Sequence, residues 1–128
     1  MEKERCEFLG KQIFLSALEV HKYLGPGLLE SIYEYALLKE LQLRNIQVKY
    51  QLHMPLVYKG QHTGKSFYID MLVEDEIIVE IKSVEVLLTV HEAQLLSYLR
   101  LANKQLGFLI NFNVSLLKEG FKRKVNNY

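Results

Sequence analysis

Apolar residues recur at helical spacing over the first part of the chain, which predicts an amphipathic helix over residues 9–24. One face of this segment collects Leu9, Ile13, Ala17, Val20 and Leu24. Gly25-Pro26-Gly27 ends the helix, because glycine permits a backbone reversal and proline cannot continue the hydrogen-bond ladder. A second helix is expected directly afterwards, up to about Arg44.

The middle of the chain changes to the alternation that is typical of β-strands. Strands are predicted over residues 46–58, 66–73 and 77–82. The segment GQHTGK, residues 60–65, is expected to form the turn between the first two strands. The acidic segment Glu74-Asp75-Glu76 is expected to join the second strand to the third.

The last third of the chain predicts one more helix and two more strands. Thr89 followed by Glu92 has the spacing of a capping box, so a helix is expected from Val90 to about Asn103. The apolar run of residues 107–112 is typical of a strand covered on both faces. Residues 115–119 could add a helical turn and residues 121–125 an edge strand. The predicted fold is therefore a single α/β domain over residues 1–128, with a mixed sheet flanked by helices.

Bulk charge does not identify a partner. The chain has 16 Lys and Arg against 15 Asp and Glu, a net charge of +1, so a nucleic acid would have to be held by a local basic patch. Candidate residues for such a patch are Lys118, Lys122, Arg123 and Lys124 near the C-terminus and Lys59 and Lys65 near the first turn.

Cysteine usage and the polar N-terminus favour a cytoplasmic protein. Cys6 is the single cysteine, which excludes an internal disulfide and suits a reducing compartment. No apolar run approaches the roughly 18 residues that a membrane-spanning helix needs. We therefore expect no membrane partner.

Charged residues interrupt the two strands on either side of the acidic turn. Alternation places Glu80 and Lys82 on the same face as Ile78. If the turn contains three residues, Asp70 lies directly across from Glu80, whereas a turn of two residues would put them on opposite faces. The turn lacks the Asn-Gly or Asp-Gly of the tightest hairpins, which favours the longer loop.

Two carboxylates that face each other in this way repel unless a cation bridges them or they share a proton. Oxygen ligands suit Mg²⁺ or Mn²⁺, and Lys82 could orient a water beside such a metal. The alternative is that Asp70, Glu80 and Lys82 belong to the solvated face of an ordinary hairpin.

Polar residues on two helices add to this picture. Glu30 is in line with Tyr33, Leu37 and Leu41, so it interrupts a largely apolar stripe, whereas Glu34 is expected on the solvent side. On the later helix, Gln94 and Tyr98 are neighbours at i and i+4, a pair that is otherwise ordinary helix surface.

With these motifs the chain resembles the bacterial family named for its Gly-x-x-Glu-x-x-Tyr motif, here Gly27-Leu-Leu-Glu30-Ser-Ile-Tyr33. That family is assigned to the PD-(D/E)xK nuclease superfamily. The blocks that carry the resemblance are EVHKYLGPGLLESIYEYAL, YIDMLVEDEIIVEIKSVE, HEAQLLSYLRL and LINFNVSLLKEGFKR.

The resemblance implies a restriction-endonuclease-like fold and a metal site. Asp70 matches the motif aspartate, Glu80-Ile81-Lys82 matches its Glu-x-Lys, and Glu30 matches an acid carried on a helix. The implied ligands of Mg²⁺ or Mn²⁺ are Asp70, Glu80, the carbonyl of Ile81 and, directly or through water, Glu30. Lys82 would orient or deprotonate the attacking water.

Gln94 and Tyr98 resemble the Gln-x-x-x-Tyr element of RecB and lambda-exonuclease-type enzymes, which is associated with positioning the DNA strand. Tyr33 is expected in the second layer of the site. The implied activity is metal-dependent hydrolysis of nucleic-acid phosphodiester bonds, with DNA favoured over RNA. The rival hypothesis is a non-catalytic module that binds nucleic acid or protein on the same scaffold. The sequence does not fix the oligomeric state, but a domain this small acting on a duplex often works as a pair, so a homodimer is one possible assembly.

Overall fold

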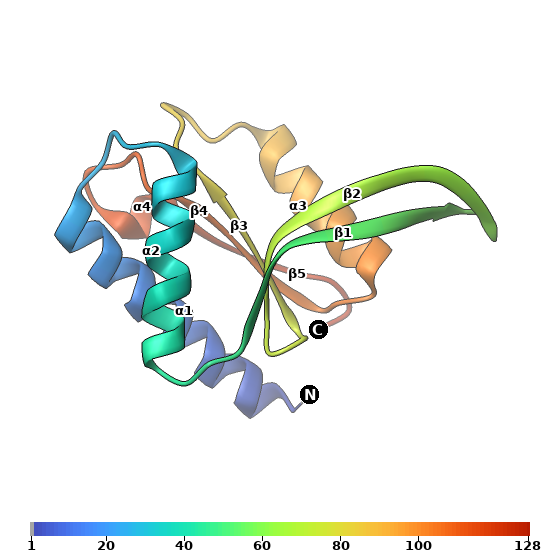
Figure 1. Ribbon diagram of the computed structural model, residues 1–128, viewed down its shortest axis with the longest axis horizontal. Coiled ribbons are helices and arrows are strands. Elements are labelled where there is room, and N and C mark those ends of the chain that lie inside the picture. Colours follow the sequence, from blue (N-terminus) through green and yellow to red (C-terminus); the bar gives the residue numbers. More distant parts are fainter. Residues whose placement is uncertain (1) are drawn as a thin grey trace.

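The computed structural model describes residues 2–128 (Figure 1). Its elements in chain order are α1 (Lys3–Leu24), α2 (Glu30–Leu43), β1 (Val48–Tyr58), β2 (Gln61–Val73), β3 (Ile77–Lys82), α3 (Thr89–Ala102), β4 (Leu106–Asn111), α4 (Leu117–Gly120) and β5 (Phe121–Val125). The predicted order of helices and strands is confirmed. No helix within these residues has the length and apolar character needed to cross a membrane.

The five strands form one mixed sheet in the order β1-β2-β3-β4-β5. All neighbours are antiparallel except β3 and β4, which run parallel and are joined through α3. Every residue of β4 is buried, as the apolar run predicted, because helices cover both faces of the sheet at this point. The predicted α/β fold is therefore confirmed.

Two apolar clusters lie on opposite faces of the sheet. The larger cluster joins α1 and α2 to the sheet, with Leu37 packed among side chains such as Met71 and Val79. The smaller cluster joins α3 to the other face and contains Ile69, Leu72, Ile78, Leu95, Leu99 and Leu109. Figure 1 shows α1 and α2 side by side on one face, with α3 on the other.

The β1–β2 hairpin is much longer than the rest of the sheet. Its outer part, residues 52–69, curves away past α3 in Figure 1, and we call it the hairpin arm. The arm stays attached to α3 because Ile69 is buried in the smaller cluster and Phe67 stacks on Tyr98, with ring centroids 5.0 Å apart.

The alternation of side chains along β2 is broken just before the arm begins. Strict alternation would put Ile69 and Met71 on one face, yet Ile69 packs beneath α3 and Met71 beneath α1 and α2. The change falls at Asp70 and at the facing Gln51, which has a φ of 51° and lies between two regular pairs of the ladder. This irregularity sets Asp70 apart from the regular sheet.

Three predicted boundaries are wrong. The first helix begins at Lys3, six residues before the predicted start, and the second begins at Glu30 instead of directly after Gly27. The first turn contains only Lys59 and Gly60, with φ values of 49° and 77°, and residues 61–65 belong to β2. Positive φ at both turn residues matches the right-handed twist of a hairpin, which explains why the strands extend so far.

The predicted capping box at Thr89 is also wrong. Thr89 is already the first helical residue of α3, and the N-cap is Leu88. Nδ1 of His91 accepts the Leu88 N–H at 3.0 Å and so satisfies this free donor. Glu92 instead forms an ion pair with Lys124, at 2.6 Å between Oε1 and Nζ.

Candidate active site

The acidic turn has the three-residue register that brings two carboxylates together. Val73 pairs with Ile77, and the pairing continues regularly to Met71 and Val79. At the next position the ladder is replaced by two hydrogen bonds between backbone N–H groups and side-chain carboxylates. The Asp70 N–H donates to Oε2 of Glu80 at 2.8 Å, and the Ile81 N–H donates to Oδ2 of Asp70 at 2.9 Å. We call Asp70 and Glu80 the carboxylate pair.

Burial makes ionisation of this pair unfavourable. Glu80 is only 5% exposed, and its burial, followed by the charge of Asp70, raises its pKa to about 8. Burial also raises the pKa of Asp70, although the Ile81 N–H and the charge of Lys82 oppose this shift. At neutral pH without a bound cation, the pair therefore holds a proton.

Glu34, which the sequence pattern placed on the solvent side, lies within electrostatic reach of Asp70. It is half-buried, and its Oε1 accepts a hydrogen bond of 2.7 Å from Nε2 of Gln51. Burial raises the pKa of Glu34, with further increases from the charges of Asp70 and Glu30. Its spacing of four residues from Glu30 was the available signal, since such residues share a helix face.

Glu30 lies near the carboxylate pair, but its side chain is not close enough to form a three-residue metal site with Asp70 and Glu80. It is exposed at the start of α2, and its Oε2 accepts the Ser83 N–H at 3.4 Å. Ser83 Oγ also donates to the Leu28 carbonyl at 2.5 Å, so the segment after β3 is tied to the segment before α2. The charge of Glu30 contributes to the raised pKa of Asp70, which places the two carboxylates within electrostatic reach of each other.

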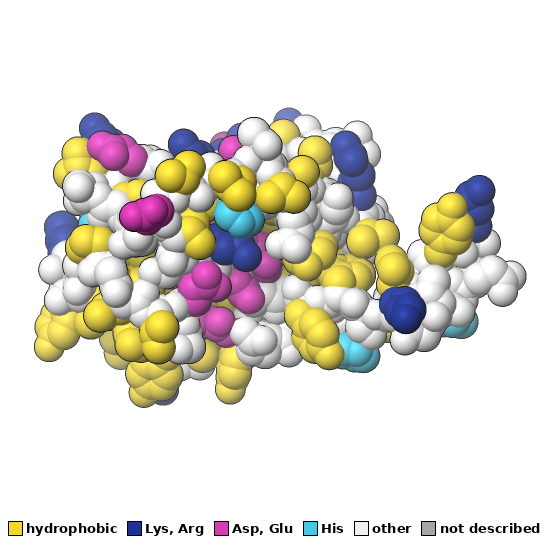
Figure 2. Space-filling view, turned by 90° about the horizontal axis from the view of Figure 1, so that it is seen from above, with side chains coloured by type: hydrophobic (Ala, Val, Ile, Leu, Met, Phe, Trp, Pro, Cys, Tyr) yellow, Lys and Arg dark blue, Asp and Glu magenta, His cyan; other side chains and the backbone are white. Residues whose placement is uncertain are grey.

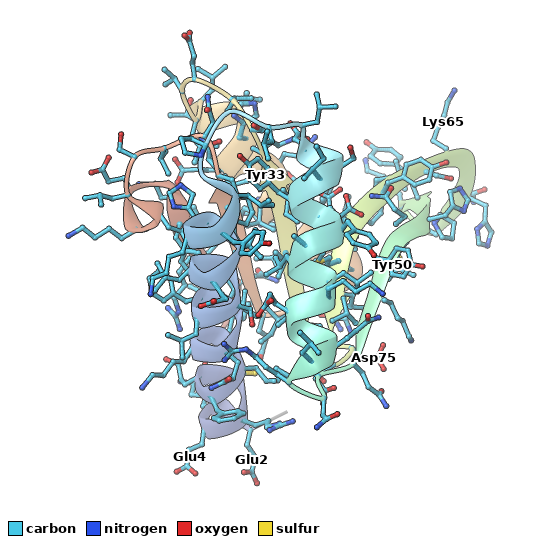
Figure 3. The ribbon with its side chains drawn as sticks, turned by 60° about the vertical axis from the view of Figure 1, so that its left-hand side comes forward. Glu2, Glu4, Tyr33, Tyr50, Lys65 and Asp75 are labelled. Carbon is cyan, nitrogen blue, oxygen red and sulfur yellow. The ribbon has the colours of Figure 1, made fainter. Side chains whose placement is uncertain are left out.

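Tyr33 is buried behind Glu30 and fixes the loop that precedes α2. Its hydroxyl donates to the Gly25 carbonyl at 2.5 Å and accepts the Leu28 N–H at 3.1 Å. Its ring stacks on Phe112, with centroids 4.5 Å apart and planes 6° from parallel. Figure 3 shows Tyr33 between the upper ends of α1 and α2. The side chain therefore fixes the loop before α2 from the interior of the protein.

Asn111 is a second residue that the sequence analysis did not select. It is 2% exposed at the end of β4, where its side-chain amide bonds both the N–H and the carbonyl of Val84, at 3.0 and 2.9 Å. Its Oδ1 also accepts the Asn113 N–H at 3.2 Å. These bonds hold the chain as it leaves Lys82, so Asn111 positions the end of β3. A polar residue within an apolar strand was the signal.

Of the predicted pair on α3, Tyr98 is the one that the electrostatics connect to the carboxylates. Burial raises its pKa, and the charges of Glu80 and Asp70 raise it further, so the phenol stays protonated and can donate a hydrogen bond. Gln94 is exposed one turn earlier on the same helix. The position of Lys82 at the end of β3 lets its charge lower the pKa of both members of the pair.

The donors of the carboxylate pair fit a hard divalent cation. One oxygen of each carboxylate binds a backbone N–H, which leaves Oδ1 of Asp70 and Oε1 of Glu80 for a ligand. Among residues 2–128, no three His, Cys, Asp or Glu side chains gather closely enough to hold a metal by themselves. Mg²⁺ is often held by one or two carboxylates and completed by waters and substrate phosphate, so the pair is a sufficient protein contribution.

Acidic side chains gather on one face of the molecule. Figure 2 looks down on the ends of α2 and β3 and shows acidic side chains gathered near the middle of this face, with a basic side chain and a histidine next to them. Mixed charge of this kind at the end of a sheet could bind a metal and a phosphate together.

The geometry agrees with the comparison to known families. The family model described as the PD-(D/E)XK nuclease superfamily matches residues 7–124. Searches of curated proteins and of solved structures found no match. The match covers both members of the carboxylate pair, Lys82, and the helices around them.

Proposed function

Because the chain belongs to the PD-(D/E)XK nuclease superfamily, we propose that it is a Mg²⁺- or Mn²⁺-dependent nuclease that hydrolyses phosphodiester bonds in DNA. The observation that carries this proposal is the carboxylate pair. Two acidic side chains are held together in a buried position, at a cost in unfavourable ionisation that a bound cation would offset. A purely structural hairpin has no need of this arrangement.

Asp70, Glu80 and the carbonyl of Ile81 are the proposed ligands of the metal, with Glu30 reaching it through water. The metal would polarise the phosphate and lower the pKa of a bound water. The residues around it have separate tasks. Lys82 orients the attacking water and stabilises negative charge on the phosphate, while Glu34 and Gln51 fix the position of α2 against β1.

Gln94 and Tyr98 are proposed to position the nucleic-acid strand. Tyr98 supports this role because its protonated phenol is a hydrogen-bond donor next to the acidic pair. Hydrolysis itself adds the water oxygen to phosphorus, breaks one phosphorus–oxygen bond and transfers a proton to the leaving oxygen. DNA is proposed as the substrate on the strength of the Gln-x-x-x-Tyr resemblance.

The test is a cleavage assay on single-stranded, duplex and branched DNA and on RNA, each with Mg²⁺ or Mn²⁺. The double variant Glu80→Ala/Lys82→Ala is expected to lose activity by a factor of at least about 100, because it removes a ligand and the water-orienting cation. The matched control Glu85→Ala/Lys118→Ala changes the same types of charge at exposed positions and should cleave like the wild type.

Equal cleavage by the wild type and the Glu80→Ala/Lys82→Ala variant would indicate a contaminating nuclease. Absence of metal-dependent cleavage on every substrate would contradict the proposed enzyme and favour the binding module instead.

A further inference from the structure

The hairpin arm carries basic side chains and no acidic ones. Residues 52–69 contain no Asp or Glu, although the chain has 15 acidic residues in all. The arm carries Lys59 and Lys65 together with His53 and His62, and all four are exposed. The acidic site begins at the next residue, Asp70. A positively charged surface therefore extends from a negatively charged site.

Two basic residues of the predicted C-terminal patch are paired with acidic side chains. Near the C-terminus, Lys124 pairs with Glu92 at 2.6 Å and Arg123 with Glu7 at 3.3 Å. In the predicted basic patch this leaves less positive charge than the sequence indicated. On the arm, Figure 2 shows basic and histidine side chains without acidic ones, and Figure 3 shows Lys65 pointing outward from β2.

The arm also exposes aromatic rings along its length. Tyr58 is 64% exposed and Tyr68 is 57% exposed, so both rings are open to a ligand. Tyr68 lies against His53, with ring centroids 5.2 Å apart, and faces away from α3. At its base the arm reaches the site through the stack of Phe67 on Tyr98. Exposed rings are therefore present both near the tip of the arm, at Tyr58, and at its base, at Tyr68, two residues before Asp70.

We propose that the hairpin arm binds the single strand of nucleic acid that extends beyond the carboxylate pair. Unpaired bases stack on Tyr68 and Tyr58, and the phosphates lie near Lys59 and Lys65. A single strand is the fitting ligand, because a ring can stack only on an unpaired base and two lysines offer little for a duplex backbone. The inference takes the class of ligand from the proposed function but does not depend on cleavage.

The test measures binding of a fluorescein-labelled single-stranded 20-mer to the full chain by fluorescence anisotropy in EDTA, where no metal-dependent cleavage occurs. Tyr58→Ala/Tyr68→Ala is expected to raise the Kd by a factor of roughly 5 or more for each stacked base. Lys59→Gln/Lys65→Gln is expected to weaken binding and to reduce the slope of log K against log salt by about 1.4.

The matched control is Lys11→Gln/Lys118→Gln, which removes the same charge from exposed positions on α1 and α4 and should leave the Kd within about twofold. Far-ultraviolet circular dichroism and a thermal melt check that each variant folds. Because all the altered side chains are exposed, we expect unchanged spectra.

Three results would overturn the proposal. These are a wild-type protein that does not bind the strand, arm variants that bind no worse than the control, and duplex binding that is as tight as single-strand binding and insensitive to the tyrosines. A shift from dimer to monomer in the arm variants, with unchanged affinity, would assign the arm to self-association instead. Loss of binding in these variants alongside absent nuclease activity would sustain this inference while contradicting the proposed enzyme.

Discussion

Glu80 connects the chemistry of the site to the stability of the fold. Its pKa is raised from its ordinary value of 4.5 to about 8 by burial and by the neighbouring Asp70. Between pH 4.5 and about 8, the folded protein therefore keeps a proton that the unfolded chain has already lost. Stability from this group is fully present below pH 4.5 and is lost as the pH rises through about 8. The raised pKa of Asp70 acts in the same direction.

Glu80→Gln should remove this dependence, because the amide is similar in shape and cannot ionise. In EDTA we expect the variant to be more stable than the wild type at pH 8 by on the order of 2 kcal/mol, and nearly equal to it at pH 5. Urea unfolding at the two pH values measures the difference. A variant that is less stable than the wild type at pH 8 would show that the buried carboxylate is stabilised by contacts that outweigh its desolvation.

Tyr33→Phe tests the support of the site from the interior. Loss of the hydroxyl breaks its bonds to Gly25 and Leu28 and leaves the Leu28 N–H without that partner, so we expect a loss of about 1 to 2 kcal/mol in urea unfolding. Cleavage should slow as well, since the same loop accepts the bond from Ser83.

Tyr35→Phe is the control for this substitution, because Tyr35 is exposed on the same helix and its change should stay within about 0.5 kcal/mol. Equal effects of the two substitutions would argue that the Tyr33 hydroxyl has no special role.

At the residue scale, the sequence predicted the positions of the side chains that depend only on the pairing register of the strands. Asp70 and Glu80 meet because a three-residue turn fixes every later pair. Glu34 and Asn111 depend on how α2 packs against β1 and how β4 ends beside the segment after β3. Contacts between elements that are far apart in the sequence leave no pattern in the local sequence. The helical spacing of apolar residues therefore predicted that Glu34 lies on the solvent side.

Among the elements, α4 and the end of β4 approach each other closely at Gly120. A Cβ at Gly120 would lie well inside contact distance of the Asn111 carbonyl oxygen. Gly120 therefore allows the chain to turn from α4 into β5 directly beside β4, where Asn111 positions the end of β3.

Gly120→Ala should force these segments apart and destabilise the protein by about 2 kcal/mol or more in urea unfolding. A lower rate of cleavage is expected too, because Asn111 would move with β4. Ser115→Ala, an exposed change in the same connection, serves as the control. Wild-type stability in the glycine variant would mean that the backbone adjusts here at little cost.

The sequence predicted the element boundaries that depend on the pattern of apolar and polar side chains. It missed the boundary that depends on backbone geometry at the first turn. The predicted bounds of β3, α3 and β4 each lie within one residue of the observed ones. The first turn was placed over residues 60–65, because its glycines and polar residues are typical of loops. In the structure, positive φ at Lys59 and Gly60 reverses the chain at once, and Gly64 is accommodated within β2.

For the whole molecule, metal binding and protonation should be coupled. A cation binds the ionised carboxylates, so it competes with the proton that the pair holds near neutral pH. Since a ligand that binds only the folded state raises its stability, Mn²⁺ should increase the melting temperature more at pH 8 than at pH 6. Differential scanning fluorimetry across this range measures the effect.

Glu80→Gln should show little change in melting temperature with Mn²⁺ at either pH, because it lacks the ionisable ligand. A wild-type shift that is the same at both pH values, or that persists in the variant, would place the metal elsewhere.

The three-residue turn between β2 and β3 has a further consequence for the order of folding. Asp70 and Glu80 are separated by only ten positions, so the hairpin can close early at a small entropic cost. Glu30 is more than fifty positions from Ser83, the residue that it contacts, and must arrive later with α2. The two acids therefore meet before any helix shields them, and a pH low enough to protonate one of them should speed the refolding of the chain.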